Sequence, residues 1–198
     1  MRAVVLEVSP AELAHRKLTG ADRHDEMWEG VLHIAPVPSR EHQRILDELI
    51  VFLLPLLKRT QRGMLRSGIN VFDEESPKEN YRIPDLTFVA FGRDSVLAED
   101  GIRGGGPEAV VEIRSPGDES YEKLPFFAGL GVREVLVIDR DTRRPELFRL
   151  AGRQYVAVAP DRDGWHVSES LRVKLRRAPD AKLLVIEDLD DPNSKAEI

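Results

Sequence analysis

Two acidic residues beside short apolar segments give the clearest indication of chemistry in this sequence. Asp85 follows a proline, and Glu112 stands between Val111 and Ile113. Apolar neighbours of this kind are normally buried, and a buried carboxylate stays ionised only when it is paired or binds a cation. Two carboxylates that converge on one pocket repel each other. We therefore expect Mg²⁺ or Mn²⁺ between them, because magnesium prefers oxygen ligands and is often held by one or two carboxylates together with substrate phosphate.

Lys123 and His42 are the candidate assisting residues. A lysine beside a carboxylate pair would act as a point charge on a phosphate and on the attacking water. Lys123 reaches this position if its helix folds back over the strand end, and a solvated lysine is the alternative. His42 lies in the first turn of a long predicted helix, where a positive charge is mildly unfavourable. A neutral imidazole that faces the pocket and a plain surface histidine are both open interpretations.

The acidic residues also have purely structural interpretations. Asp85 fits a turn, because proline and aspartate are common turn residues. Glu112 fits an ion pair across the sheet with Arg114 or Arg82. Asp118 fits a helix N-cap without chemistry, or an auxiliary position in the site. The order of the acidic residues and the lysine along the chain favours the functional interpretation.

Short strands and a few helices would position these residues. Ser39 begins a helical pattern that runs to about residue 57, with leucine and isoleucine at three- and four-residue steps, and an earlier helix follows Ser9 to about residue 18. A short helix is expected over residues 120–128. Strands are predicted at residues 64–72, 82–91, 108–115, 134–139, 146–150, 154–158 and 168–175, and a strand or hairpin at 27–34, whereas residues 183–186 are expected to pack against the rest of the fold. This order predicts an α+β fold, with a mixed central β-sheet flanked by helices and additional antiparallel strands.

Length and composition set the remaining bounds. We expect 198 residues to form a single domain over 1–198, with a core at about 24–175 and a polar, frayed tail at about 188–198. The absence of cysteine excludes disulfides, thiolate zinc sites and cysteine nucleophiles, and the five histidines lack the spacing of a zinc site. No segment has the roughly 20 apolar residues of a membrane-spanning helix, nor does the N-terminus resemble a secretory signal. We expect a cytoplasmic protein that does not contact membranes.

Charge limits the kind of nucleic-acid contact that is possible. The net charge of −6 argues against coating of nucleic acid by bulk electrostatics, although a nuclease needs only a local basic wall. Two cationic groups could follow a phosphate backbone: Arg172, Lys174 and Arg176 along a predicted strand, and Lys58, Arg59 and Arg62 at the end of the long helix. We favour the alternative, in which these charges protect an edge strand and a helix end.

The motifs resemble a known family when they are taken in order. They are Trp28-Glu-Gly-Val31, Pro38-Ser-Arg-Glu-His42, Pro84-Asp85, Glu112-Ile-Arg-Ser-Pro116, Asp118, Lys123 and the run from Gly131 to Asp139. Over about residues 24–175 this set resembles the Uma-type restriction endonuclease family, a branch of the PD-(D/E)XK nuclease superfamily. The resemblance implies a restriction-endonuclease-like core in which Asp85 and Glu112 bind the metal, the carbonyl of Ile113 completes its shell, and a lysine assists catalysis. The expected activity is magnesium-dependent hydrolysis of DNA phosphodiester bonds, with a possible homodimer for double-strand cutting.

The sequence departs from the superfamily pattern at two positions. The lysine expected two residues after the acidic residue is Arg114, so we expect Lys123 to supply the amine instead. Phe127 stands where this branch often has tyrosine, which puts any contribution from a phenol in doubt. Arg114 also motivates a rival hypothesis, a binding module for nucleic acid or protein that keeps the fold without turnover. The acidic net charge motivates a second rival, a hydrolase of small phosphoesters.

Overall fold

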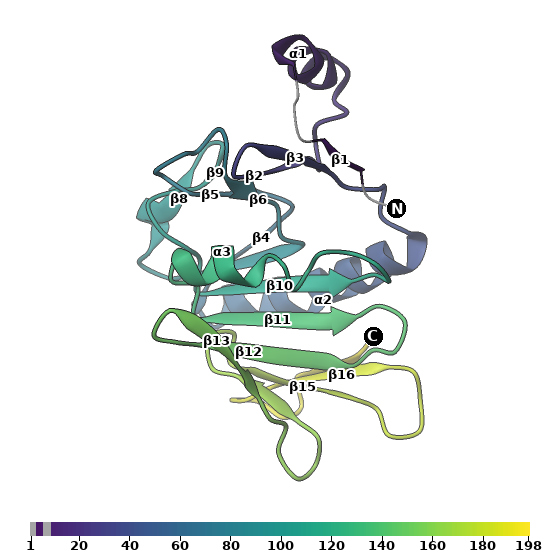
Figure 1. Cartoon of the computed structure of the whole chain (residues 1–198). Coiled ribbons are helices and arrows are strands. Elements are labelled where there is room, and N and C mark those ends of the chain that lie inside the picture. The colour runs from purple at the N-terminus through teal and green to yellow at the C-terminus, as the bar shows by residue number, and fades with distance from the viewer. Residues whose placement is uncertain (1–2, 6–8) are drawn as a thin grey trace.

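Three β-sheets and three α-helices make up the part of the chain that this computed structural model describes, residues 3–5 and 9–198 (Figure 1). The helices are α1 (Pro10–Thr19), α2 (Arg40–Arg59) and α3 (Leu124–Gly129), and a short 3-10 helix covers Asp94–Val96. The mixture of mixed sheets and few helices confirms the predicted α+β class.

The sheets differ in their place along the chain. The first has the order β1-β3-β2-β6-β5-β9-β8 and consists of β1 (Ala3–Val5), β3 (Val31–Ile34), β2 (Glu26–Trp28), β6 (Tyr81–Arg82), β5 (Asn70–Phe72), β9 (Gly101–Ile102) and β8 (Leu97–Ala98). The central sheet has the order β13-β12-β11-β10-β7-β4 and consists of β13 (Gln154–Val158), β12 (Pro145–Ala151), β11 (Glu134–Asp139), β10 (Ala109–Arg114), β7 (Leu86–Ala90) and β4 (Gly63–Ser67). The third consists of β14 (His166–Ser168), β15 (Val173–Arg177), β16 (Leu184–Asp188) and β17 (Lys195–Glu197), in chain order.

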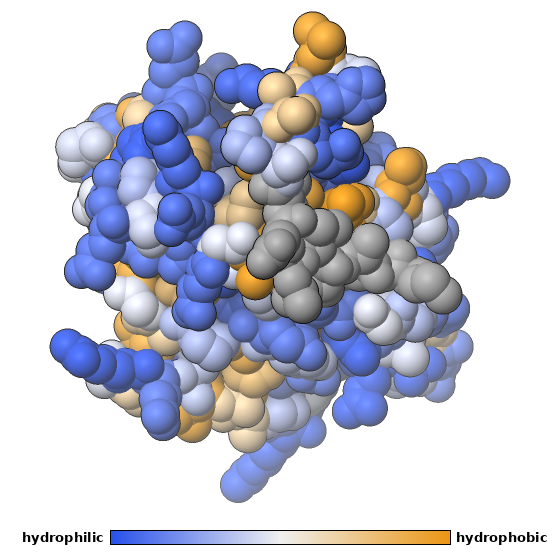
Figure 2. Space-filling view, turned by 45° about the horizontal axis from the view of Figure 1, so that its top comes forward, coloured by the Kyte–Doolittle hydropathy of each residue, from blue (hydrophilic) through white to orange (hydrophobic). Residues whose placement is uncertain are grey.

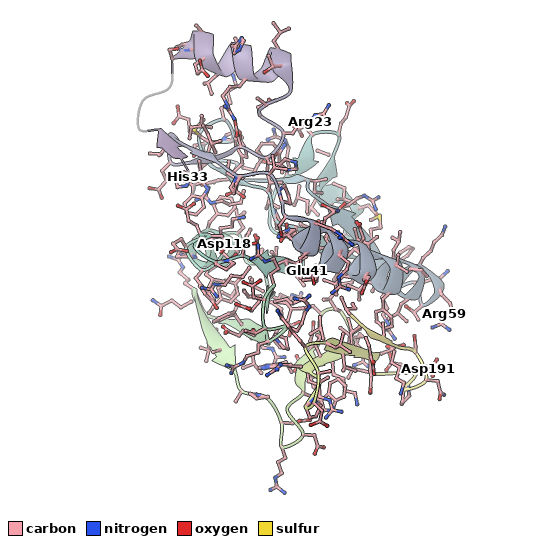
Figure 3. The ribbon with its side chains drawn as sticks, turned by 90° about the vertical axis from the view of Figure 1, so that its right-hand side faces the viewer. Arg23, His33, Glu41, Arg59, Asp118 and Asp191 are labelled. Carbon is pink, nitrogen blue, oxygen red and sulfur yellow. The ribbon has the colours of Figure 1, made fainter. Side chains whose placement is uncertain are left out.

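Helix α2 covers one face of the central sheet. It begins after Ser39, whose hydroxyl accepts a hydrogen bond from the backbone N–H of His42, and it continues through Pro55 to Arg59. Its buried residues lie at three- and four-residue steps, as the sequence pattern predicts; they are Ile45, Leu49, Leu53, Leu56 and Leu57. Figure 3 labels residues near its two ends, Glu41 and Arg59.

Strands β10 and β11 form the buried centre of the molecule. They run parallel, and their apolar side chains alternate between the two faces of the sheet. Val111 and Ile113 face the cluster that contains α2 and the third sheet, whereas Val110 and Val135 face the cluster that contains α3. Glu112 therefore points to the α3 face, because it alternates with Val111 and Ile113 along β10. Figure 1 shows α3 next to β10, between the central sheet and the first sheet.

Two segments that were expected to be single strands are each divided between two sheets, so these two predictions are wrong. Residues 64–72 bend at Gly68, whose φ of 58° belongs to the left-handed region that favours glycine. Residues 82–91 are interrupted around Pro84, which has no N–H to donate to a ladder. In both cases one half joins the central sheet and the other half joins the first sheet.

The predicted strand or hairpin at 27–34 is a hairpin of β2 and β3, with the turn at Glu29 and Gly30. The predicted helix over 120–128 is too long, because α3 begins only at Leu124. Pro125 lies in its first turn, where the missing N–H is tolerated. Lys123 is consequently the N-cap residue of α3 and not a helical residue.

The C-terminal segment is ordered, so the prediction of a frayed tail at 188–198 is wrong. Strand β17 pairs with β16, and the backbones of Leu184 and Ile198 exchange two hydrogen bonds of 2.8 Å. The side chain of Ile198 is 1% exposed and belongs to the same core as α2. Burial of this last apolar residue explains why a polar sequence is held in place. The single-domain assignment itself stays a prediction.

The surface is mostly polar. Hydrophilic side chains cover most of the face in Figure 2, where hydrophobic side chains form small separate patches. Among the described residues, no helix is long and apolar enough to cross a membrane.

Candidate active site

The register of the central sheet brings Asp85 and Glu112 together. Strands β7 and β10 are antiparallel, and Leu86 is paired with Val111. Because the strands are antiparallel, Asp85, which precedes Leu86, lies opposite Glu112, which follows Val111. Their side chains lie on the α3 face, since the paired residues Leu86 and Val111 belong to the cluster on the α2 face.

Asp85 is held by two hydrogen bonds. Its Oδ2 accepts from the backbone N–H of Ile113 at 2.6 Å, and its Oδ1 lies 3.0 Å from Nε2 of His42 at the start of α2. Burial alone would lower the pKa of His42, but the hydrogen bond to Asp85 and its charge outweigh burial and raise this pKa. The structure thus brings His42 to the site through Asp85, which makes it more than a surface histidine.

Lys123 joins Glu112 to a third carboxylate, that of Glu26. Its Nζ lies 3.1 Å from Oε1 and 3.3 Å from Oε2 of Glu112, and 2.7 Å from Oε1 of Glu26. All three side chains are buried, with exposed fractions of 3% to 4%. Neither structural alternative for Glu112 is found, because its charged partner is Lys123 rather than Arg114 or Arg82.

The charges at this position do not balance. Burial would lower the pKa of the Lys123 ammonium, but Glu112 and Glu26 outweigh it and keep this pKa raised. Burial also raises the pKa of Glu112, to about 8. The charges of Asp85 and Glu26 add to this increase, and the charge of Lys123 only partly offsets it. Three carboxyl groups face one buried ammonium, so Glu112 holds a proton near neutral pH unless a further cation takes the place of that proton.

Glu26 is a site residue that the sequence analysis missed. Its Oε1 also accepts from the N–H of Ile83 at 2.9 Å, and its Oε2 accepts from Nε1 of Trp28 at 2.8 Å. Burial would raise the pKa of Glu26, but the charge and hydrogen bond of Lys123 outweigh burial and lower it. The available signal was an acidic residue at the beginning of the hairpin that contains Trp28. Its partner lies 97 positions later, which no local pattern reveals.

Arg114, the residue in the expected lysine position, is engaged elsewhere. Its Nη1 donates to Oδ2 of Asp139 at 3.0 Å, and its guanidinium lies 5.2 Å from the ring centre of Tyr121. Asp139 also accepts hydrogen bonds from the turn that follows β11. Arg114 therefore links the last residues of β10 and β11 through its salt bridge with Asp139, and Lys123 is the amine beside Glu112.

Asp118 organises the loop between β10 and α3. Its carboxylate accepts hydrogen bonds from the N–H of Ser115 and from both the N–H and the hydroxyl of Ser120. In Figure 3 it lies close to the N-terminal end of α2. Phe127, where a phenol was in question, is fully buried in the hydrophobic cluster against β10 and β11. Asp118 therefore fixes the loop beside the cavity, and Phe127 packs in the hydrophobic core.

A cavity of about 260 Å³ opens above these residues. Asp85, Glu112, Glu26 and Lys123 line it together with His42; Ser39, Ser115, Gly117, Asp118 and Arg140 are also among its lining residues. No group of three or more His, Asp or Glu side chains among the described residues is placed to ligate a metal together. The donor set fits magnesium in the manner of two carboxylates, Asp85 and Glu112, whose remaining ligands come from water and phosphate.

The fold resembles that of a solved structure. A crystal structure from Anabaena variabilis, described as a putative nuclease belonging to DUF820, aligns with a TM-score of 0.59 and 17% sequence identity, over 74% of this chain and 82% of that chain. This likeness confirms the restriction-endonuclease-like core. No curated protein matches the chain.

The fold thus places the chain in the class of proteins with a restriction-endonuclease-like core. The sequence profile of the family Uma2, described as "Putative restriction endonuclease", matches residues 11–180. The chain belongs to this family, as the resemblance of its motifs predicted.

Proposed function

We propose that this protein is a metal-dependent endonuclease that hydrolyses phosphodiester bonds in DNA at the cavity above Asp85 and Glu112. The observation that carries the proposal is the meeting of Asp85, Glu112 and Lys123 in one cavity, although they come from three different elements. Two carboxylates and an amine are the groups that the PD-(D/E)XK type of site uses. The displaced lysine supports the proposal because the amine is present although Arg114 occupies the usual position.

The carboxylates of Asp85 and Glu112 would hold Mg²⁺ or Mn²⁺, with the carbonyl of Ile113 as a further candidate ligand. When bound, the cation supplies charge neutralisation on the phosphate and lowers the pKa of a bound water. Binding requires that Lys123 shares Glu112, since its Nζ lies within 3.3 Å of both carboxylate oxygens. Glu26 provides a second carboxylate that keeps the ammonium near the site when this sharing occurs.

The chain's own residues then have distinct roles. Lys123 carries a fixed positive charge toward the substrate phosphate, where it stabilises developing negative charge. Glu26 positions Lys123 and does not itself reach the substrate in this proposal. His42 orients Asp85 through the 3.0 Å contact, so that the other oxygen of Asp85 remains on the N–H of Ile113. The near-complete burial of Lys123 and Glu112 keeps bulk water from weakening these interactions.

The test is cleavage of supercoiled plasmid and of single-stranded DNA by the purified protein with Mg²⁺, Mn²⁺ or EDTA. Asp85→Asn and Lys123→Met remove one charge each while keeping similar side-chain volumes. We expect metal-dependent cleavage by the wild type and a loss of at least about 100-fold in both variants. Asp163→Asn and Lys58→Met, at exposed positions, are the matched controls and should cleave like the wild type.

The rival functions give different outcomes in the same experiment. DNA binding without cleavage under any metal would identify a binding module on the nuclease fold. Hydrolysis of a small phosphoester that DNA does not inhibit would identify the alternative hydrolase. Equal cleavage by wild type and Asp85→Asn would remove Asp85 from the site and with it the proposed function.

Double-strand cutting would require a particular oligomeric state. Two copies of the chain would place two sites on opposite strands, so a homodimer should form at least on DNA. Sedimentation velocity with and without duplex DNA measures this directly, and a monomer under both conditions would leave nicking as the activity. A cytoplasmic location, with access to DNA, belongs to the same proposal.

A further inference from the structure

Three of the six cationic residues that could have followed a phosphate backbone, Arg62, Arg172 and Lys174, are paired with acidic residues within the described part of the fold. Arg62 forms salt bridges with Asp188 and Asp190, and Lys174 forms one with Glu187. Arg172 pairs with Asp190, and Arg176 lies over the ring of Trp165. These contacts fit the structural interpretation of the two cationic groups. Nucleic acid requires cations that lie nearer to the catalytic cavity.

A second hollow, of about 400 Å³, adjoins that cavity. The two share a wall at Ile83. They are also joined through the backbone, because Gly68 in the hollow donates its N–H to the carbonyl of Asp85 at 3.3 Å. The two hollows are therefore neighbours, with Ile83 between them.

The hollow contains two exposed arginines, Arg23 and Arg66. Neither forms a salt bridge with any residue that the structure describes; the guanidinium of Arg66 donates only to a backbone carbonyl and a methionine sulfur. Two acidic residues line the same hollow: Asp100, which is paired with Arg103, and the exposed Glu99. In Figure 3, Arg23 lies between α1 and the N-terminal end of α2. With Asp100 paired to Arg103, the hollow has two arginines against the single carboxylate of Glu99, so its lining is cationic by one charge.

Arg140 lies on the lining of the catalytic cavity. Its Nη1 lies 3.3 Å from the hydroxyl of Ser39 and 3.4 Å from that of Ser115, which are long contacts that a phosphate oxygen can replace. Its guanidinium also forms a salt bridge with Asp141, at 2.9 Å, so a phosphate at Arg140 would have to compete with this carboxylate. The carboxylates of the site consequently lie in a depression with Arg140 in one part and, beyond Ile83, Arg66 and Arg23 in the other.

We propose that the hollow of Arg23 and Arg66 binds the sugar-phosphate backbone of a nucleic-acid strand next to the phosphate that is cleaved. The strand runs from Arg140 over Asp85, crosses Ile83 and continues to Arg66 and Arg23. This inference rests on the proposed nuclease function and adds to it a direction and a binding site for the substrate. It also explains how a chain with a net charge of −6 binds a polyanion, since only local cations contact the phosphates.

The experiment measures binding and cleavage separately. Fluorescence anisotropy with a short fluorescein-labelled DNA, in EDTA, gives Kd over a range of salt concentrations for wild type, Arg23→Ala, Arg66→Ala and the double variant. We expect Kd to rise on the order of tenfold for each arginine. The slope of log Kd against log salt should fall by about 0.7 to 0.9 per lost phosphate contact. With metal present, KM should rise in the variants while kcat stays close to the wild-type value.

Arg153→Ala is the matched control, because this exposed arginine lies in the β12–β13 turn, at the opposite end of β12 from Arg140. An unchanged Kd and salt slope in the double variant, or an equal loss in Arg153→Ala, overturns the proposed path. Failure of the path is distinct from failure of the function. If Asp85→Asn abolishes cleavage while the arginine variants bind normally, the nuclease stands and the strand takes another route. If Asp85→Asn cleaves normally, the nuclease site is refuted independently of the arginines.

Discussion

At the level of single residues, the unusual feature of this site is a buried lysine with two carboxylate partners. Lys123 is 3% exposed, and the cost of burying its ammonium must be offset by negative charge, which Glu26 and Glu112 supply. A bound metal would use Glu112 as a ligand, so Glu26 would then be the main carboxylate partner of Lys123. The consequence is that Glu26 should affect activity through Lys123, although less than a residue that binds the metal.

Replacement of Glu26 tests this positioning role. Glu26→Gln should lower kcat by about 10- to 100-fold, because the carboxylate that fixes the amine becomes neutral. The measurement is a double-mutant cycle with Lys123→Met, in which Glu26→Gln should cause little further loss once the amine is gone. An equal loss in both backgrounds would show that Glu26 only supports the fold. Trp28→Phe, which removes one hydrogen bond to Glu26 and leaves Lys123 in contact with it, should have a smaller effect.

The sequence could identify the part of the site that local patterns describe. Asp85 and Glu112 stand beside strand residues, and the ordered motifs include Lys123; the structure brings these three together. Glu26 could not be found in this way, because it lies in a three-residue strand and acts on a residue of another part of the chain. The position of the Arg114 side chain likewise depends on Asp139, a partner on a different strand that no local pattern identifies.

At the level of elements, Glu134 joins the central sheet to the third sheet. It begins β11, and its carboxylate accepts hydrogen bonds from the hydroxyl of Ser168 and from the N–H groups of Glu169 and Ser170. Arg149 adds a salt bridge of 2.9 Å. Burial would raise the pKa of Glu134, but these hydrogen bonds outweigh burial and lower it.

The lowered pKa predicts the pH dependence of this junction. The ionised form of Glu134 is favoured in the folded state, so its contribution to stability is present above the unfolded-state pKa of about 4.5 and is lost as pH falls through the lower folded-state value. Glu134→Gln should reduce the free energy of unfolding by about 1.5–3 kcal/mol at neutral pH. Urea denaturation from pH 7 down to pH 3 should show the difference between wild type and variant shrinking. A difference that is constant over this range would contradict the assignment.

The last strand gives a second prediction at this level. Ile198→Ala should lower the free energy of unfolding by about 2–5 kcal/mol, because a fully buried side chain of the main core is lost at the terminal residue. Chemical denaturation measures the effect, with Lys195→Ala at an exposed position of the same strand as the control. Equal stability of the two variants would mean that the C-terminal strand is not part of the cooperative unit.

Elements with strong local patterns were predictable, and those that depend on sheet membership were not. The periodic leucines of α2 and the apolar run of β11 define them without further information. The separation of β4 from β5 and of β6 from β7 depends on which sheet each half joins, a choice made by distant partners. The polar tail was mispredicted because one buried isoleucine and a strand pairing outweigh its composition.

At the level of the whole molecule, the site exists only where four parts of the chain meet, one of them the N-cap of α3, which supplies Lys123. The first sheet supplies Glu26, the central sheet supplies Glu112 and the residue that precedes β7, and the N-terminal turn of α2 supplies His42. A ligand that bridges Asp85 and Glu112 binds only the assembled state. It should therefore stabilise the folded protein as a whole.

Thermal unfolding tests this coupling without any measurement of activity. At a metal concentration of about 100 times Kd, binding to the folded state alone adds about 2.7 kcal/mol. For a chain of this size, Tm should then rise by roughly 5–10 °C with Mg²⁺ or Mn²⁺ and return to its original value with EDTA. Asp85→Asn should show no such shift, whereas Asp163→Asn should respond like the wild type. A Tm that does not depend on metal in the wild type would argue against a metal site here.

The loop between β10 and α3, which the hydrogen bonds of Asp118 hold in place, also limits which changes in loop length this protein can accept during evolution. In a site whose amine stands on the same strand as the acid, the lengths of the surrounding loops are free to vary. Here the amine comes after the loop, at the cap of α3, so its distance from Glu112 is set by the residues between them. Insertions and deletions between Ser115 and Lys123 should therefore be excluded among active relatives, whereas the β12–β13 turn should tolerate them.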